Sequence, residues 1–253
     1  MHYLLKITEN PRLQEDINNT RTKISQLLIQ SSDNIKSVNF SSISNNDLRL
    51  LFDLYDLLFF DNWFKDNYKG QILFSLSKRM SRSAGLTICP RNISKIKQEN
   101  VIIEIRIGIN LIFNYHSTER MKTVSGITTS SSLEALELVF EHEICHLIEF
   151  LLYKKSSCKN KRFKNIAHNL FGHTDSYHKL PTNTKIAVEQ LGFKLGDEVS
   201  FNYKGKEKRG ILYNIRKRAI IFVMDKNGVY SDKNGMRYTK YYVPLKSLKE
   251  SEE

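Results

Sequence analysis

The segment His142-Glu143-Ile144-Cys145-His146 constrains the fold of this chain more than any other feature. It lies in a run whose apolar side chains recur at helical spacing: Leu136, Phe140, Ile144, Leu147 and Leu151. Ser130 to Ser132 can cap this run, so we expect a helix from Leu133 to about Tyr153. Histidines at positions i and i+4 lie one turn apart on one helix face, so both imidazoles can reach a single metal ion.

Glu143 directly follows the first of these histidines and is the candidate catalytic residue. A carboxylate at this place can take a proton from a water that zinc has acidified towards a pKa of about 7. The structural alternative is a pair of surface histidines beside an ordinary helical glutamate. We favour the zinc interpretation because the apolar stripe can fix the helix in a core.

A catalytic zinc usually has three protein ligands and one water, so a third ligand must come from elsewhere in the chain. The sequence offers four candidates: Cys158, His168, His173 and His178. A helix is expected from Arg162 to Phe171, closed by Gly172. Cys158 precedes this helix, where a thiolate is a good ligand, and His173 follows its end, where a fixed loop can aim it inward. We take Cys158 and His173 as the metal-ligand candidates to test.

Several stretches around this box resemble one known family. They occur in the order Leu54-Tyr55-Asp56, Phe59-Phe60, Ser75 to Gly85, Ile103 to Ile107, and His142 to His146. Together they make residues 47–180 similar to the SprT-like zinc metallopeptidases. The region from Ser156 to His178 looks like that of a bacterial-type subgroup with a C-terminal SH3/KOW-like barrel.

The resemblance implies an α+β, zincin-like fold in which helices pack on a small antiparallel sheet, with the zinc helix beneath the sheet edge. It also implies Zn²⁺ as the cofactor and an extended peptide bound along the edge strand. Val101 to Ile107 is our candidate for a strand near the site. In the family a histidine lies four residues before an aromatic residue that looks like Phe163; here Lys159 occupies that place and Cys158 is its neighbour.

The chain divides into three regions by pattern. Residues 1–45 form a polar, partly helical extension, and residues 46–185 form the metallopeptidase domain. Short strand-like runs separated by turns follow at 198–203, 210–215, 219–224 and 241–245. They predict a small SH3-like β-barrel over residues 192–249.

This last region is the most basic part of the molecule. Residues 192–249 hold 14 lysines and arginines against 5 acidic residues, a net charge of +9 out of +12 for the whole chain. Basic side chains interleaved with tyrosines can neutralise phosphates and stack bases, although the tyrosines could equally fill the barrel core. Our candidate nucleic-acid-binding residues, for DNA or RNA, are Lys206, Lys208, Arg209, Arg216, Lys217 and Arg218.

Composition excludes other classes. The three cysteines are too few and too scattered for a disulfide scaffold, and no apolar run approaches the ~18 residues of a membrane span. The first ten residues do not resemble a signal peptide, because Lys6 and Glu9 interrupt them. We therefore expect a protein of a reducing, cytoplasmic compartment that does not act on a membrane.

The sequence thus predicts a zinc-dependent endopeptidase that acts on a protein substrate and is directed to nucleic-acid-bound proteins by its basic barrel. The alternative is a non-hydrolytic, zinc-containing nucleic-acid-binding protein.

Glu149 could hold a metal ligand in place through a hydrogen bond, but a solvated carboxylate is the more common case for a residue of this type. Tyr177 is a candidate donor to a developing oxyanion.

Overall fold

The computed structural model describes residues 1–81, 83–216 and 218–250. It divides into two compact units, unit 1 over Met1–Leu180 and unit 2 over Pro181–Glu253. Unit 1 holds helices α1 to α7: α1 His2–Glu9, α2 Gln14–Ser31, α3 Asn45–Phe59, α4 Trp63–Asn67, α5 Ile109–Phe113, α6 Ser132–Tyr153 and α7 Lys161–Phe171. It also holds strands β1 to β5: β1 Gln71–Ser77, β2 Gly85–Ile88, β3 Ile102–Gly108, β4 Lys122–Val124 and β5 Ile127–Thr129.

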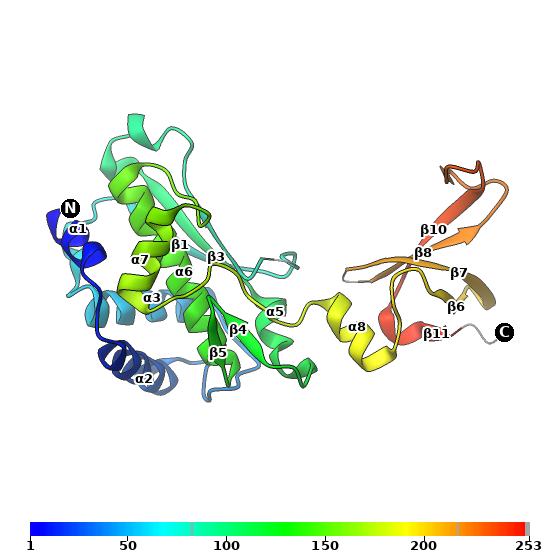
Figure 1. Ribbon diagram of the computed structural model, residues 1–253, viewed down its shortest axis with the longest axis horizontal. Coiled ribbons are helices and arrows are strands. Elements are labelled where there is room, and N and C mark those ends of the chain that lie inside the picture. The colour runs from blue at the N-terminus through cyan, green and yellow to red at the C-terminus, as the bar shows by residue number, and fades with distance from the viewer. Residues whose placement is uncertain (82, 217, 251–253) are drawn as a thin grey trace. The chain divides into compact units, whose positions relative to one another are not determined.

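The main sheet of unit 1 has three strands in the order β1-β3-β2. The neighbouring strands β1 and β3 are labelled in Figure 1. β3 alternates as its sequence predicts, with Ile103, Ile105 and Ile107 buried against the helices. β2 runs antiparallel to β3, but β1 runs parallel to it, from Gln71 opposite Ile102 to Ser77 opposite Gly108. The expectation of an antiparallel sheet is therefore corrected: the sheet is mixed, and β3 is its central strand.

Helices α3 and α6 pack against this sheet, α3 on β1 and α6 on β2 and β3. A cluster of aromatic rings fills the space between these helices and α7, including Tyr55, Phe59, Phe140 and Phe171. The predicted helix caps are present. Ser131 accepts a hydrogen bond from the Glu134 amide at the start of α6, and Gly172 ends α7 in the left-handed conformation.

The N-terminal region is part of this core and not a separate extension. Leu4 on α1 and Ile17, Ile24 and Leu28 on α2 are almost fully buried, and the two helices pack against α3, α6 and α7. The many polar residues of this region hide the pattern in sequence, because most of those on α2 lie on its outer face, although Arg21 is buried. The polar stretch from Ser32 to Ser44 ends in a capping box between Ser44 and Asp47 at the start of α3.

Unit 2 begins with helix α8, Asn183–Leu191, and continues as one antiparallel sheet. Its strands are β6 Glu198–Tyr203, β7 Lys206–Ile215, β8 Ala219–Met224, β9 Tyr230–Ser231, β10 Arg237–Val243 and β11 Lys249–Glu250. They pair in the order β11-β6-β7-β8-β10-β9. The predicted closed barrel is not formed by the described strands, because the outer strands β9 and β11 have two residues each and do not pair with one another. Val199, Phe201, Leu212 and Ile221 make the core of unit 2.

Candidate metal centre

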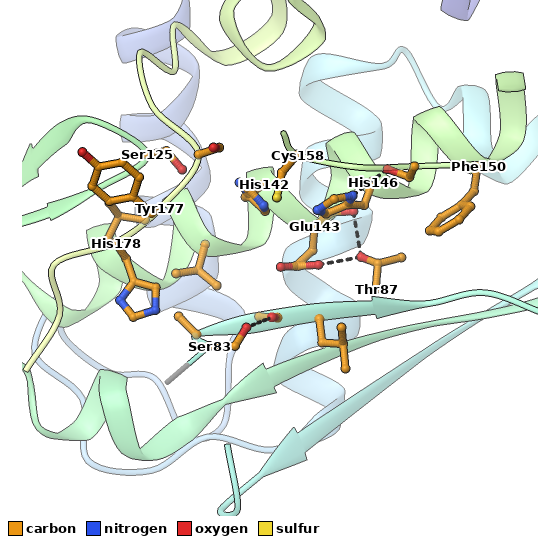
Figure 2. Close-up of a pocket in the computed structure, with 17 residues that line it drawn as sticks. Ser83, Thr87, Ser125, His142, Glu143, His146, Phe150, Cys158, Tyr177 and His178 are labelled. Atoms are coloured by element: carbon orange, nitrogen blue, oxygen red, sulfur yellow. Dashed lines mark hydrogen bonds between the residues drawn. The ribbon is translucent and has the colours of Figure 1, made fainter. Parts of the chain in front are cut away.

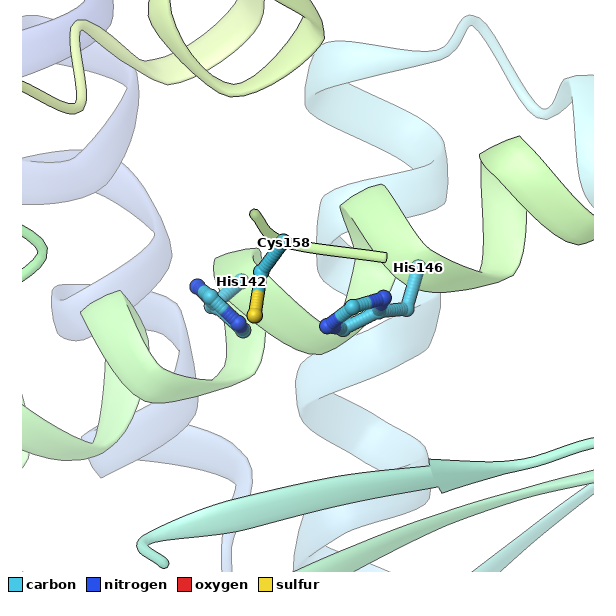
Figure 3. Close-up of side chains that lie close together, drawn as sticks. All are labelled: His142, His146 and Cys158. Carbon is cyan, nitrogen blue, oxygen red and sulfur yellow. The ribbon is translucent and has the colours of Figure 1, made fainter. Parts of the chain in front are cut away.

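Helix α6 and the segment before α7 bring three potential metal ligands together. The ligand atoms of His142, His146 and Cys158 all lie within 4.8 Å of one another (Figure 3). The two histidines come from successive turns of α6, and their ring centroids are 4.9 Å apart. Cys158 reaches them from the short connection between α6 and α7.

Phe163, in the first turn of α7, packs on both imidazoles. Its ring centroid lies 4.8 Å from that of His142 and 4.4 Å from that of His146, and the side chain is fully buried. This apolar surrounding disfavours the charged form of the imidazoles. Burial lowers the pKa of His142 to about 3 and that of His146 to about 4, so both rings are neutral near pH 7, which is the form that binds metal.

A hydrogen-bond chain behind His146 fixes which of its ring nitrogens faces the other ligands. The Ser156 hydroxyl donates to Glu149 Oε2 over 2.5 Å, and His146 Nδ1 lies 2.6 Å from Ser156 Oγ. Because the single hydroxyl proton goes to the carboxylate, Nδ1–H of His146 donates to Ser156. Nε2 of His146 therefore keeps its lone pair for a metal ion.

Glu149 accepts the hydrogen bonds that connect α6 to the segment before α7. It is completely buried, its Oε1 accepts a hydrogen bond from Arg162 over 2.7 Å, and its Oε2 also accepts from the backbone N–H of Ser157. The expectation that Glu149 is solvated is therefore corrected. One carboxylate ties a ligand on α6 to the connection that carries Cys158.

Glu143 lies between α6 and strand β2 at the floor of a cavity (Figure 2). The Thr87 hydroxyl of β2 donates to Glu143 Oε2 over 2.7 Å, and Gly85 of the same strand leaves room for the carboxylate, since a methyl group there would overlap it. Burial raises the pKa of Glu143 to about 7, although the hydrogen bonds from Thr87 act in the opposite direction. A carboxyl group with a pKa in this range can act as a general acid or a general base near neutral pH.

The cavity has a volume of about 390 Å³ and is open to solvent on one side. Ser83 to Thr87 of the β2 segment form one wall, and Val124, Ser125 and residues 176–178 form another. Figure 2 shows Tyr177 and His178 at one end and Phe150 at the other. Tyr177 lines the cavity at the end opposite Phe150, its side chain is 58% exposed, and a hydrogen bond to Asp175 raises its pKa.

The other candidate ligands lie elsewhere. His173 is buried, and its Nε2 is 2.7 Å from Glu141 Oε2, so the structure does not bring it into the ligand group. His168 is exposed on α7. His178 lines the cavity but is outside the three-residue group found among the described residues.

Glu141 of α6 is the centre of a second, largely buried network of hydrogen bonds. Arg21 of α2 donates to both of its oxygens over 2.7 Å, and the Tyr55 hydroxyl donates to Oε1 over 2.8 Å. Burial alone would raise the pKa of Glu141, but Arg21 and His173 outweigh it and hold this pKa below its usual range. Sequence reasoning did not find this network, because Arg21 and Glu141 are 120 positions apart.

The candidate nucleic-acid-binding residues separate into two groups in unit 2. Lys206, Lys208 and Arg209 lie in the first half of β7, whereas Arg216 and Arg218 lie where β7 leads into β8. Lys217 lies outside the described residues. Tyr241, in contrast, packs in the core of unit 2, as the alternative interpretation of the tyrosines has it.

Comparison with known proteins assigns the fold around this site. The chain matches the SprT-like family over residues 48–185, which include β2, all of α6, Cys158 and α7. No curated protein and no solved structure that was compared matches the chain. Within the described residues, no helix has the length and apolar character needed to cross a membrane. Because the matched region is more than half of the sequence, this chain belongs to the SprT-like family.

Proposed function

We propose that the protein is a zinc-dependent endopeptidase whose metal ligands are His142, His146 and Cys158. The observation that carries the proposal is the convergence of three ligand atoms within 4.8 Å of one another at the floor of an open cavity, next to a buried carboxyl group. Two neutral imidazoles and one thiol suit zinc, and three protein ligands are the usual number at a catalytic zinc site. A bound zinc ion would polarise the substrate carbonyl and acidify a water.

The residues of the chain supply the remaining steps. Glu143 takes a proton from the attacking water and later gives it to the leaving amine, and its raised pKa suits both transfers. Thr87 holds one carboxylate oxygen and leaves Oε1 available for that proton. β2 is an edge strand of the three-stranded sheet, so an extended peptide can pair with its free edge through main-chain hydrogen bonds.

The decisive experiment compares the zinc-loaded parent protein with Glu143→Gln on unfolded casein. We expect Glu143→Gln to keep about one zinc per chain, measured by elemental analysis, and to lose cleavage by at least about 100-fold. Glu99→Gln, an exposed glutamate in unit 1, is the matched control and should cleave like the parent. Cleavage at the parental rate by Glu143→Gln would exclude this mechanism.

Two further variants test the ligand set. Cys158→Ser should weaken zinc binding strongly, because it removes one of three ligands. His173→Ala should leave zinc bound, because His173 contacts Glu141 instead of the ligand group. Loss of zinc from His173→Ala together with retention in Cys158→Ser would reverse the assignment.

We also propose that unit 2 tethers the peptidase to nucleic acid. The support is its net charge of +9 over residues 192–249. Fluorescence anisotropy of the full-length protein with labelled DNA and RNA should show binding that weakens steeply as salt rises. Absence of binding to any of these strands at about 50 mM salt would remove the tether and leave the peptidase proposal intact.

A further inference from the structure

One face of the unit 2 sheet carries a recess of about 530 Å³, bordered by β7, β8 and β10. Three aromatic rings and three cations line it: Tyr213, Phe222, Tyr242, Arg216, Arg218 and Lys240. We call this surface the β7–β8–β10 recess. Arg216 and Arg218 are among the candidate nucleic-acid-binding residues named from the sequence.

Strand register explains why these side chains share one face. Lys240 pairs with Phe222, and Tyr242 pairs with Ile220, so all four project from the same side of β8 and β10. The alternate residues Ile221 and Tyr241 point into the core on the other side. The register of β7 against β8 shifts between Leu212 and Asn214, and Tyr213 lies at this irregularity.

The rings are open to solvent although they are large. Tyr213 is 61% exposed and Tyr242 is 57% exposed, while Phe222 forms a half-buried floor whose centroid lies 4.9 Å from that of Tyr213 in an edge-to-face contact. Lys240 Nζ lies 5.5 Å from the centroid of Tyr242. The recess therefore offers aromatic surface on which a flat group can stack, with positive charge beside it.

Charge selects the kind of ligand. Three cations border the recess, and no carboxylate is among its described lining residues. A ligand that combines repeated negative charges with flat aromatic groups is a nucleic acid. Only an unpaired strand exposes its base faces, because a duplex buries them in its own stack.

We propose that the β7–β8–β10 recess binds a single-stranded nucleic acid, with bases stacked on Tyr213 and Tyr242 and phosphates held by Arg216, Arg218 and Lys240. This proposal rests on the nucleic-acid tether and not on the peptidase activity. It limits the proposed nucleic-acid ligand to unpaired strands. It also assigns the main binding contacts to the recess instead of to the basic residues in the first half of β7.

The test measures binding of full-length protein to labelled single strands of about 12 nucleotides, as DNA and as RNA, and to the matching duplex. We expect a single strand to bind at least about tenfold more tightly than the duplex. The tighter of the two single strands identifies the source of the ligand. Equal or tighter binding of the duplex would overturn the proposal while leaving a general tether in place.

Stacking is tested separately from charge. Tyr213→Ala and Tyr242→Ala should each weaken binding of the single strand roughly tenfold, and Tyr213→Phe should restore it, because the ring and not the hydroxyl makes the contact. Both tyrosines are exposed, so these variants keep the fold. Tyr203→Ala, an exposed tyrosine of β6 outside the recess, is the matched control and should bind like the parent. Parental binding by both alanine variants would overturn the proposal.

A charge series completes the design. Removing Arg216, Arg218 and Lys240 together should reduce the slope of log K against log salt by about 2, since each phosphate contact contributes about 0.7 for a single strand. The triple variant Lys206→Ala, Lys208→Ala and Arg209→Ala removes equal charge outside the recess and should change the slope less. Polyglutamate serves as a competitor that carries charge but no bases. If it displaces the labelled strand as effectively as an unlabelled strand does, charge alone is recognised and the stacking proposal is overturned.

Discussion

The Ser156 hydroxyl donates a 2.5 Å hydrogen bond to Glu149, and the same hydroxyl links this carboxylate to the candidate ligand His146. His146 is held by Ser156, and the connection that carries Cys158 is held by the same carboxylate through the amide of Ser157. Partners of this kind orient metal ligands, and their loss typically weakens metal binding by 10- to 100-fold.

Glu149→Gln should therefore weaken zinc binding by about 10- to 100-fold, measured by competition with a chelator. Glu137→Gln is the matched control, because Glu137 is buried on the same helix but contacts Ser25 instead of a ligand. Equal zinc affinity of the two variants would show that Glu149 does not position the site.

Gly85→Ala should separate metal binding from catalysis. A methyl group at this position overlaps the Glu143 carboxylate, so the carboxylate must move from its place beside Thr87. We expect a loss of cleavage of at least about tenfold with normal zinc content, because a small displacement of a catalytic group is costly. Ile102→Ala changes an exposed side chain of the same sheet and should cleave normally. A fully active Gly85→Ala would show that cleavage does not depend on the position of the Glu143 carboxylate beside Thr87.

Arg21→Met should destabilise unit 1 by roughly 3 kcal/mol, because it leaves the buried Glu141 carboxylate without its cation. Unfolding in urea can be followed by the fluorescence of Trp63, which is the single tryptophan of the chain and lies in unit 1. Lys23→Met, on an exposed position of the same helix, should change stability by less than about 0.5 kcal/mol. Similar losses in both variants would argue against the buried ion pair.

Glu137 should make stability depend on pH. Burial raises its pKa to about 8, so the folded chain binds a proton here that the unfolded chain, with an ordinary pKa of about 4.3, has already lost. Stability should fall as pH rises through this window. Glu137→Gln removes the effect and should be at least roughly 2 kcal/mol more stable than the parent near pH 8, but no more stable near pH 4. Urea unfolding curves that keep the same difference at both pH values would contradict this.

Periodicity in the sequence was sufficient to predict helices α6 and α7 with their caps, and spacing was sufficient to predict that His142 and His146 lie together on one face of α6. These features are local: a helical turn fixes the relation between His142 and His146 whatever surrounds it. Strands β1 and β3 were also recognised, but their parallel pairing was not, because it depends on which segments meet after folding.

The missed features are the non-local ones. In the sequence Glu149 looks like any helical carboxylate, because its hydrogen bonds to Arg162 and to the Ser157 amide form only in the folded chain. The hydrogen bond from Thr87 to Glu143 likewise forms only when β2 packs beside α6. The open sheet of unit 2 likewise depends on the short pairings of β9 and β11, which turn signals do not reveal.

The packing of the first two helices matters to anyone who wishes to produce the SprT-like region alone. A fragment trimmed to the family boundary at residue 48 would lose the arginine that neutralises Glu141 and would uncover the apolar surface that Leu4, Ile17 and Ile24 now shield. Such a fragment would be prone to aggregate, and an inactive preparation of it would say nothing about the activity proposed for the full chain. Expression should begin at the first helix.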